Sequence, residues 1–191
     1  MCLLAFLGRN APVYTGLIAL GLAFCFAGDV YLIDGDRPDM FARGLTSFLL
    51  GHIVFIGALS QIQNLRGMAL NLERELIVGA VLGLIVLVLY VYMRPQLGGM
   101  RGPVLVYMVV ITLMTHRAVV AVDLTRAFPS QAALAAVGAI LFTVSDTMLA
   151  LNRFVFSAAG AGASGDRQDA IWVLTTYYAA ITFVALSCSV A

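Results

Sequence analysis

Two aspartates stand inside long apolar stretches of this sequence. Asp146 lies in the stretch 138–151, and Asp29 lies near the end of the stretch 11–33. A charged side chain at membrane depth costs roughly 2.5–3.5 kcal/mol on insertion scales, so such residues are candidates for function. Two nearby carboxylates in a low dielectric cannot both ionise cheaply, and such a pair divides into an acid and a base. If Asp29 and Asp146 also lie side by side in the fold, the pair is predicted to perform general acid–base chemistry.

Other polar side chains accompany the aspartates. His52 shares one face of an apolar stretch with Phe48 and Phe55. Taken alone, it is more simply a buried, hydrogen-bonded histidine than a site residue. Arg117 lies near the end of another apolar stretch, where snorkelling or a structural ion pair is the simpler interpretation and a head-group contact is the alternative. The predicted substrate- or water-positioning residues are His52, Tyr107, Ser145, Tyr177 and Tyr178.

No metal and no cofactor is predicted. The two histidines lack the spacing of a zinc-binding pair, and Cys2, Cys25 and Cys188 are too far apart for metal ligands or a redox motif. The loop 34–39 has three aspartates in a rhythm that resembles part of a calcium loop. It lacks the terminal glutamate, so a turn is the favoured interpretation and a metal site is the alternative.

Composition predicts the elements that hold these residues. Of 191 residues, 62% are hydrophobic and 11% are charged, which is far from the balance of a soluble domain. Six apolar stretches are long enough to cross a hydrocarbon core, which takes about 20 residues, and they lack the alternation of barrel strands. The predicted fold is an all-α, polytopic transmembrane helix bundle that forms a single domain over 1–191. Its helices are predicted at 11–33, 45–62, 76–93, 102–122, 132–151 and 170–190.

The alternating direction of six helices brings the polar residues to similar depths. We call the side on which the first helix ends side B, and the opposite side is side A. At 1.5 Å per residue, Asp29 and Asp146 lie roughly 6–8 Å inside side B, His52 about 10 Å and the tyrosines at 177 and 178 about 10–12 Å. Four helices thus deliver polar groups to one layer, and depth alone does not show whether they converge laterally.

Charge indicates the partners and, weakly, the orientation. All eleven basic residues are arginines, they do not form one patch, and the formal net charge is +1. Nucleic acid is therefore not a predicted partner. The loops predicted on side B hold six arginines and those on side A hold four, which favours side B as cytoplasmic. The expected location is a bacterial cytoplasmic membrane, and the oligomeric state is not encoded in these patterns.

Several motifs together resemble one known family. They are Gly28-Asp29-Val-Tyr-Leu, Gly51-His52-Ile-Val-Phe, Val106-Tyr107 through Met114 and Arg117, the stretch from Gly138 to Ala150, and Thr175-Thr-Tyr-Tyr-Ala-Ala180. Over about residues 11 to 188 the chain is similar to the YhhN family of integral membrane lysoplasmalogenases. The resemblance implies that Asp29 and Asp146 are the catalytic pair. It also implies hydrolysis of the vinyl ether bond of a single-chain ether lysophospholipid, which releases a fatty aldehyde and glycerophosphoethanolamine or glycerophosphocholine.

Two features depart from the family pattern. Family members have two further helices upstream, the second with a Lys-Pro pair, whereas this chain starts almost directly at the helix of Asp29. We expect either a truncated N-terminus or a six-helix variant. Ile181 also stands where the family has glutamine. The lysine and the glutamine of the family are candidates for contacts with the phosphate head group or with water.

Two other functions are compatible with intramembrane acids. A non-enzymatic lipid carrier, a proton-coupled carrier or a sensor would use them as proton-coupling sites, although the chain lacks the internal repeat and broken helices typical of transporters. A packing scaffold would keep both acids neutral and hydrogen-bonded to Thr143, Ser145 or Tyr178. We expect an intramembrane ether hydrolase as the leading function.

Overall fold

Helices account for every regular element of the described residues. The computed structural model describes residues 12–35, 37–65, 71–122, 130–156 and 163–190. The helices are α2 (Pro12–Leu32), α3 (Pro38–Leu65), α4 (Leu72–Met93), η1 (Gly98–Met100, a 3₁₀ turn), α5 (Arg101–Val120), α6 (Gln131–Leu151), η2 (Asn152–Phe156, a π-helical turn) and α7 (Ala163–Ser187). Within these described ranges, six segments are long and apolar enough to cross a membrane. The predicted all-α, polytopic class is confirmed, and the chain is an integral membrane protein.

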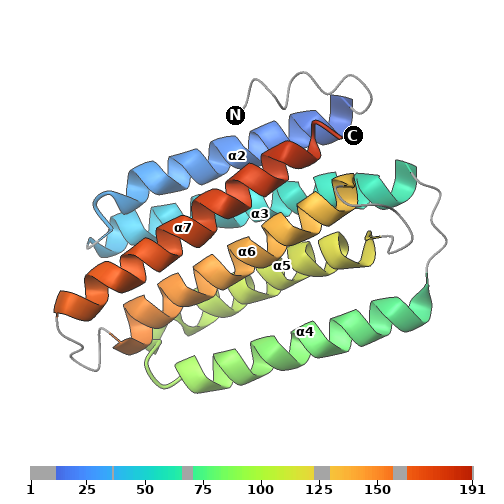
Figure 1. Ribbon diagram of the computed structural model, residues 1–191. Helices are drawn as coiled ribbons and strands as arrows, with labels where there is room; N and C mark the ends of the chain where they lie inside the picture. Colours follow the sequence, from blue (N-terminus) through green and yellow to red (C-terminus); the bar gives the residue numbers. More distant parts are fainter. Residues whose placement is uncertain (1–11, 36, 66–70, 123–129, 157–162, 191) are drawn as a thin grey trace.

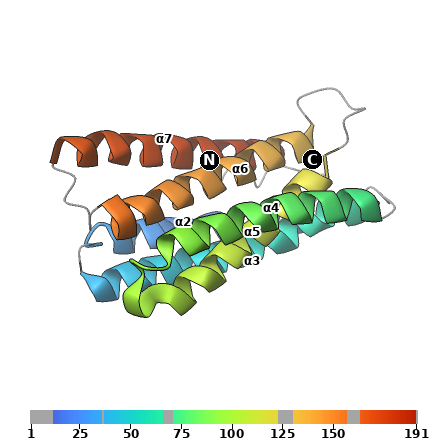
Figure 2. The same cartoon turned by 90° about the horizontal axis from the view of Figure 1, so that it is seen from below.

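The helices pack as a bundle with one peripheral member (Figure 1). The most extensive interfaces join α2 to α3 and α6 to α7. α5 lies against α3 and α6, whereas α4 contacts the bundle mainly through α5 (Figure 2). The buried core therefore lies among α2, α3, α5, α6 and α7, and α4 buries little of its surface.

Glycines set the closest helix approaches near the predicted site residues. Gly28 of α2 faces the ring of Phe48 in α3, and an added Cβ would lie 2.7 Å from that ring. Gly138 of α6 is in an equally tight place, because an added Cβ would lie 3.0 Å from the backbone nitrogen of Val184 in α7. Small residues allow such approaches in membrane bundles, where packing rather than the hydrophobic effect holds helices together.

Polar contacts near side A hold α4 against α5. Arg74 donates a hydrogen bond to the backbone oxygen of Val119 over 2.9 Å, and His116 Nε2 lies 3.5 Å from Glu75 Oε2. Asn71 caps the start of α4, because its side-chain oxygen accepts from the backbone N–H of Arg74. Much of the remaining α4 surface is exposed and apolar, which suits a helix that faces lipid.

Two helix boundaries differ from the sequence prediction. α3 begins at Pro38 rather than at 45, and α7 spans Ala163–Ser187 rather than 170–190. The added first turns are polar in sequence, so a search for apolar stretches does not detect them. Proline at the first helical position and an acidic residue in the first turn of α3 are nevertheless typical of a helix start. The other helix ends lie within a few residues of the predicted ones.

The predicted loop 34–39 forms a turn in its described residues. The backbone N–H of Arg37 donates to the backbone oxygen of Asp34 over 3.0 Å. Asp39 lies in the first turn of α3, and its carboxylate pairs with the Arg37 side chain at 3.0 Å. Asp36 lies outside the described residues. The turn interpretation is thus the one that the described residues support.

Candidate active site

Asp29 and Asp146 line the same cavity. This wide cavity, as we call it, has a volume of about 770 Å³ and lies between α2 and α7, with residues of α3 and α6 beneath it. Asp29 comes from α2, Asp146 and Ser145 come from α6, and Tyr177 and Tyr178 come from α7. The two acids therefore converge laterally as well as in depth.

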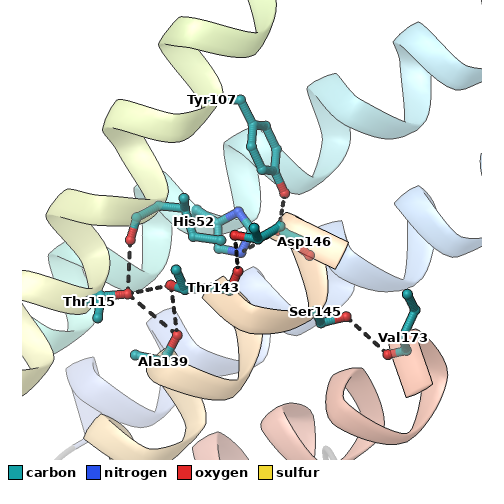
Figure 3. A network of polar contacts seen from close by, with 10 residues as sticks. His52, Tyr107, Thr115, Ala139, Thr143, Ser145, Asp146 and Val173 are labelled. Carbon is teal, nitrogen blue, oxygen red and sulfur yellow. Dashed lines mark hydrogen bonds and ion pairs between the residues drawn. The ribbon is translucent and has the colours of Figure 1, made fainter. Parts of the chain in front are cut away.

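Asp146 is the more enclosed of the two acids. The hydroxyl of Tyr107 in α5 donates a hydrogen bond to Asp146 Oδ2 (Figure 3). His52 Nε2 of α3 lies 3.7 Å from the same oxygen. The Asp146 side chain is 12% exposed, and the His52 side chain is fully buried. Because both contacts use Oδ2, Oδ1 is the oxygen of Asp146 that remains for a substrate.

His52 is held by aromatic rings. Its imidazole packs edge-to-face on Tyr107 and on Phe142, with ring centroids 5.5 Å apart in both pairs. Neither ring nitrogen meets hydrogen-bond geometry with another atom of the described residues, although buried polar atoms usually do. The buried position agrees with the simpler interpretation from the sequence, but the expected hydrogen bond is missing. A histidine in this state beside a carboxylate is suited to exchange a proton or to bind a water molecule.

Asp29 forms a second pair with a tyrosine. The hydroxyl of Tyr177 in α7 donates to Asp29 Oδ2 over 2.9 Å. Edge-to-face contacts with Phe48 and Phe142 fix the Tyr177 ring, with centroids 5.8 Å and 5.7 Å apart. This hydrogen bond connects α7 to α2. Tyr177, like Tyr107, was predicted to position substrate or water, and the contact seen in each case is with a carboxylate.

Phe142 is a site residue that sequence reasoning missed. It lies four residues before Asp146 on α6, hence on the same helix face, and it is fully buried. Its ring contacts both His52 and Tyr177, so it links the surroundings of the two acids. The spacing from Asp146 was the available signal, but many core residues share such a spacing with a polar neighbour.

The three hydroxyls of the packing-scaffold alternative do not bond to the aspartates in the described residues. Ser145 donates to the backbone oxygen of Val173 over 3.0 Å, which ties α6 to α7. The hydroxyl of Thr143 pairs with that of Thr115 at 2.6 Å (Figure 3). Tyr178 lines the wide cavity and is 57% exposed. Of the three, Ser145 and Tyr178 line the cavity that holds the acids.

Arg117 lies away from the wide cavity. It follows Tyr107 by ten residues on α5, about 15 Å along the helix toward side A, and it does not line the cavity. A head-group contact of Arg117 therefore stays a prediction from the sequence, and it would lie outside the wide cavity. The place of Arg117 in the last turn of α5 fits the simpler interpretation, a cation near the membrane interface.

A second cavity adjoins Asp146. This narrow cavity has a volume of about 60 Å³ and is lined mainly by apolar side chains of α3, α5 and α6. It shares Leu32, Phe48, Asp146 and Leu149 with the wide cavity, so Asp146 stands in the wall between the two. The narrow cavity is thus more than ten times smaller than the wide cavity.

The arrangement is suited to general acid–base catalysis in an apolar site. The two carboxylates interact electrostatically, each accepts a hydrogen bond from a phenol, and most of the side chains that line the wide cavity are hydrocarbon. A proton donor and a proton acceptor can thus approach a substrate bond from two helices. Within the described residues, no three histidine, cysteine, aspartate or glutamate side chains are grouped to hold a metal ion.

Comparison with known proteins finds relatives of this chain. A model of the YhhN family matches residues 1–188. Lysoplasmalogenase TMEM86A of Bos taurus is 32% identical over 172 residues, which cover 89% of this chain and 64% of the bovine protein. Lysoplasmalogenase TMEM86A of Homo sapiens is 32% identical over 171 residues, with the same 89% and 64% coverage. The chain thus spans less than two thirds of the length of these two relatives. No solved structure matches it.

Proposed function

The chain belongs to the YhhN family, and on that premise we propose that it is an intramembrane hydrolase that cleaves the vinyl ether bond of lysoplasmalogens. The products are a fatty aldehyde and glycerophosphoethanolamine or glycerophosphocholine. The observation that carries the proposal is the pair of aspartates, from α2 and α6, that line one largely apolar cavity. The names of the bovine and human relatives support the same substrate class.

Two carboxylates are sufficient for this reaction. Protonation of the outer alkene carbon gives an oxocarbenium ion at the ether-bearing carbon. Water adds to that carbon and gives up a proton, which forms a hemiacetal. The bond from the hemiacetal carbon to the glycerol oxygen then breaks while a proton moves to that oxygen. One water is consumed, and an aldehyde and a glycerol hydroxyl remain, with the catalytic proton returned.

We assign proton delivery to Asp146, and we assign stabilisation of the cation and activation of water to Asp29. Tyr107 and His52 both contact Asp146 Oδ2, so Oδ1 carries the transferred proton. His52 Nε2, at 3.7 Å, is close enough to return a proton to Asp146 after small movements. Asp29 lies in the last turn of α2, nearer to the side-B surface from which water enters.

Cleavage of matched lipids tests the proposal. The purified protein in bilayer vesicles is incubated with a vinyl-ether lysophospholipid and with its saturated alkyl-ether analogue, which has no alkene carbon to protonate. We expect aldehyde from the vinyl ether and no cleavage of the alkyl ether. Cleavage of neither lipid by folded protein would refute the hydrolase, and cleavage of both would refute alkene protonation as the first step.

The alternative functions predict other results in the same assay. A carrier or sensor would bind the vinyl-ether lipid and leave it intact, and a scaffold would not bind it.

The bacterial cytoplasmic membrane and the cytoplasmic orientation of side B stay predictions from the sequence.

A further inference from the structure

We propose that the hydrocarbon chain of the substrate lies along the deep end of the wide cavity, on Leu22, Phe26 and Ile181, and that the lipid enters sideways from the side-B leaflet between α2 and α7. This inference rests on the proposed function and adds to it a binding subsite and a route of entry. The three apolar residues determine which chains fit, whereas the aspartates carry the reaction.

The wide cavity has an apolar lining on the deeper side of its aspartates. The hydrogen bond between Tyr177 and Asp29 marks the polar level. Leu22 lies seven residues before Asp29 on α2, about 10 Å closer to the membrane midplane, and Ile181 lies four residues after Tyr177 on α7, about 6 Å closer. Both residues line the cavity together with Phe26. A lipid whose vinyl ether meets the aspartates therefore has hydrocarbon on its deeper side.

The wide cavity opens toward the bilayer between α2 and α7. Phe26 and Tyr178 line it and are nevertheless 70% and 57% exposed, so its outer wall is incomplete. Near side A, the hydroxyls of Tyr14 in α2 and Ser187 in α7 join the two helices at 2.6 Å. Toward side B the helices separate (Figure 1). The two helices thus form a wedge that widens toward side B, and the Tyr177 side chain crosses it at the level of Asp29.

A single-chain lipid in the side-B leaflet already has the orientation that this wedge requires. Its head group lies at the side-B interface and its chain points toward the midplane. Asp29 and Asp146 lie roughly 5–8 Å inside the side-B ends of α2 and α6, where the linkage between head and chain sits. Such a lipid can move sideways into the cavity without turning over, whereas a lipid of the other leaflet would first have to cross the membrane.

Volume argues against the narrow cavity as the chain site. Its volume of about 60 Å³ is more than ten times smaller than that of the wide cavity. The wide cavity, at about 770 Å³, lies within the range of about 300–1,000 Å³ that ligand sites occupy. Phe48 and Leu149 are common to both cavities and stand between them. A chain of many carbons is therefore accommodated on the side of Leu22 and Ile181.

Two substrates with the same head group separate the chain subsite from the chemistry. One is a long-chain vinyl-ether lysophospholipid, and the other is a water-soluble analogue with a vinyl-ether chain of a few carbons. Leu22→Trp and Ile181→Trp should each lower turnover of the long-chain lipid about tenfold or more, because an overpacked site cannot hold the chain. Turnover of the short analogue should fall less than that of the long-chain lipid, because its few carbons do not extend to Leu22 and Ile181. Met108→Trp, which fills the narrow cavity, should leave the ratio of the two rates unchanged.

The outcomes distinguish this inference from the proposed function. If the unmodified protein cleaves neither substrate, the hydrolase fails. If it cleaves both, and Met108→Trp rather than Leu22→Trp or Ile181→Trp selectively blocks the long chain, the chain lies in the narrow cavity and our inference is wrong. If Leu22→Trp and Ile181→Trp fold but lose turnover of the long-chain lipid and of the short analogue equally, the proposed chain site is also wrong.

A photocrosslink decides the matter if the tryptophan variants do not fold. The unmodified protein is incubated in vesicles with a saturated alkyl-ether lysophospholipid, then irradiated and analysed by mass spectrometry. The lipid carries a diazirine part-way along its chain, about 10 Å from the ether oxygen, which is the distance from Asp29 to Leu22 along α2. We expect labels on α2 and α7 around Leu22, Phe26 and Ile181. Labels around Met108 instead would overturn the proposed chain site, and this readout needs no turnover.

Discussion

Each aspartate of the wide cavity accepts a hydrogen bond from a tyrosine on another helix, Tyr107 for Asp146 and Tyr177 for Asp29. The partners are alike, but the surroundings differ. Asp146 has the imidazole of His52 beside it, whereas Asp29 lies in the last turn of α2. A proton donor and a water-activating base need this combination, because two identical surroundings would not set the two carboxylates apart.

Tyr107→Phe should lower kcat about tenfold to a hundredfold and leave KM unchanged. Asp146 becomes charged as it delivers its proton, and a hydrogen bond to a charged group contributes about 1.5–3 kcal/mol. Steady-state kinetics on the vinyl-ether lysolipid measure the effect. Tyr90→Phe is the matched control, since Tyr90 of α4 lines neither the wide nor the narrow cavity. An unchanged kcat in Tyr107→Phe would show that the phenol does not position the acid.

His52→Phe should lower turnover about tenfold while thermal stability stays the same or rises. Replacing buried polar atoms that lack hydrogen bonds with an apolar ring of similar shape is close to neutral for folding, and the ring can keep the contacts with Tyr107 and Phe142. Turnover falls because the group that exchanges protons with Asp146 is gone. Kinetics and thermal unfolding of the same preparation measure both quantities. Normal turnover would reduce His52 to a core residue.

At the scale of helices, the sequence predicts that Asp29 and Asp146 lie at one depth of the membrane. It does not predict which side chains contact them there. Long apolar stretches and rare intramembrane aspartates are visible without coordinates, so six helices and the depths of Asp29 and Asp146 follow. Tyr177 and Tyr178 are neighbours about 100° apart around α7, so only one of them can face the core. The choice depends on how α7 is rotated about its axis relative to α6. The pattern of apolar and polar residues in one sequence does not reveal this rotation. The polar first turn of α3 is hidden for a similar reason, because hydropathy detects burial in lipid rather than helix continuation.

Gly138→Ala should destabilise the bundle by about 1–3 kcal/mol and lower turnover. An added Cβ would lie 2.6 Å from Val184 Cγ2 and 3.0 Å from the Val184 backbone nitrogen, so α6 and α7 must move apart. That movement separates Asp146 on α6 from Tyr177 on α7. Thermal unfolding in detergent and kinetics measure the two effects. Gly83→Ala on α4 is the control, because nothing lies within 4 Å of its added Cβ. Equal behaviour of the two variants would show that the α6–α7 approach does not position the site.

At the scale of the whole molecule, α2 and α7 are joined near side A, and the site lies toward side B, where these two helices separate. Two hydrogen bonds between helices lie closer to side A than the acids do. They join Tyr14 to Ser187 and Thr115 to Thr143, and each is 2.6 Å long. The carboxylates and both cavities lie toward side B, where α2 and α7 separate (Figure 1).

The most direct test of the paired-carboxylate site is aldehyde release from a vinyl-ether lysophospholipid by Asp29→Asn and Asp146→Asn, measured in vesicles beside the unmodified protein. Asparagine keeps the size of each side chain and removes its acid–base chemistry. Asp39→Asn is the control, because Asp39 is an exposed carboxylate that pairs with Arg37 outside both cavities. We expect each of the first two variants to express and fold and to lose at least about a hundredfold in turnover, with Asp39→Asn unaffected. Near-normal aldehyde release by folded Asp29→Asn or Asp146→Asn would contradict the paired mechanism.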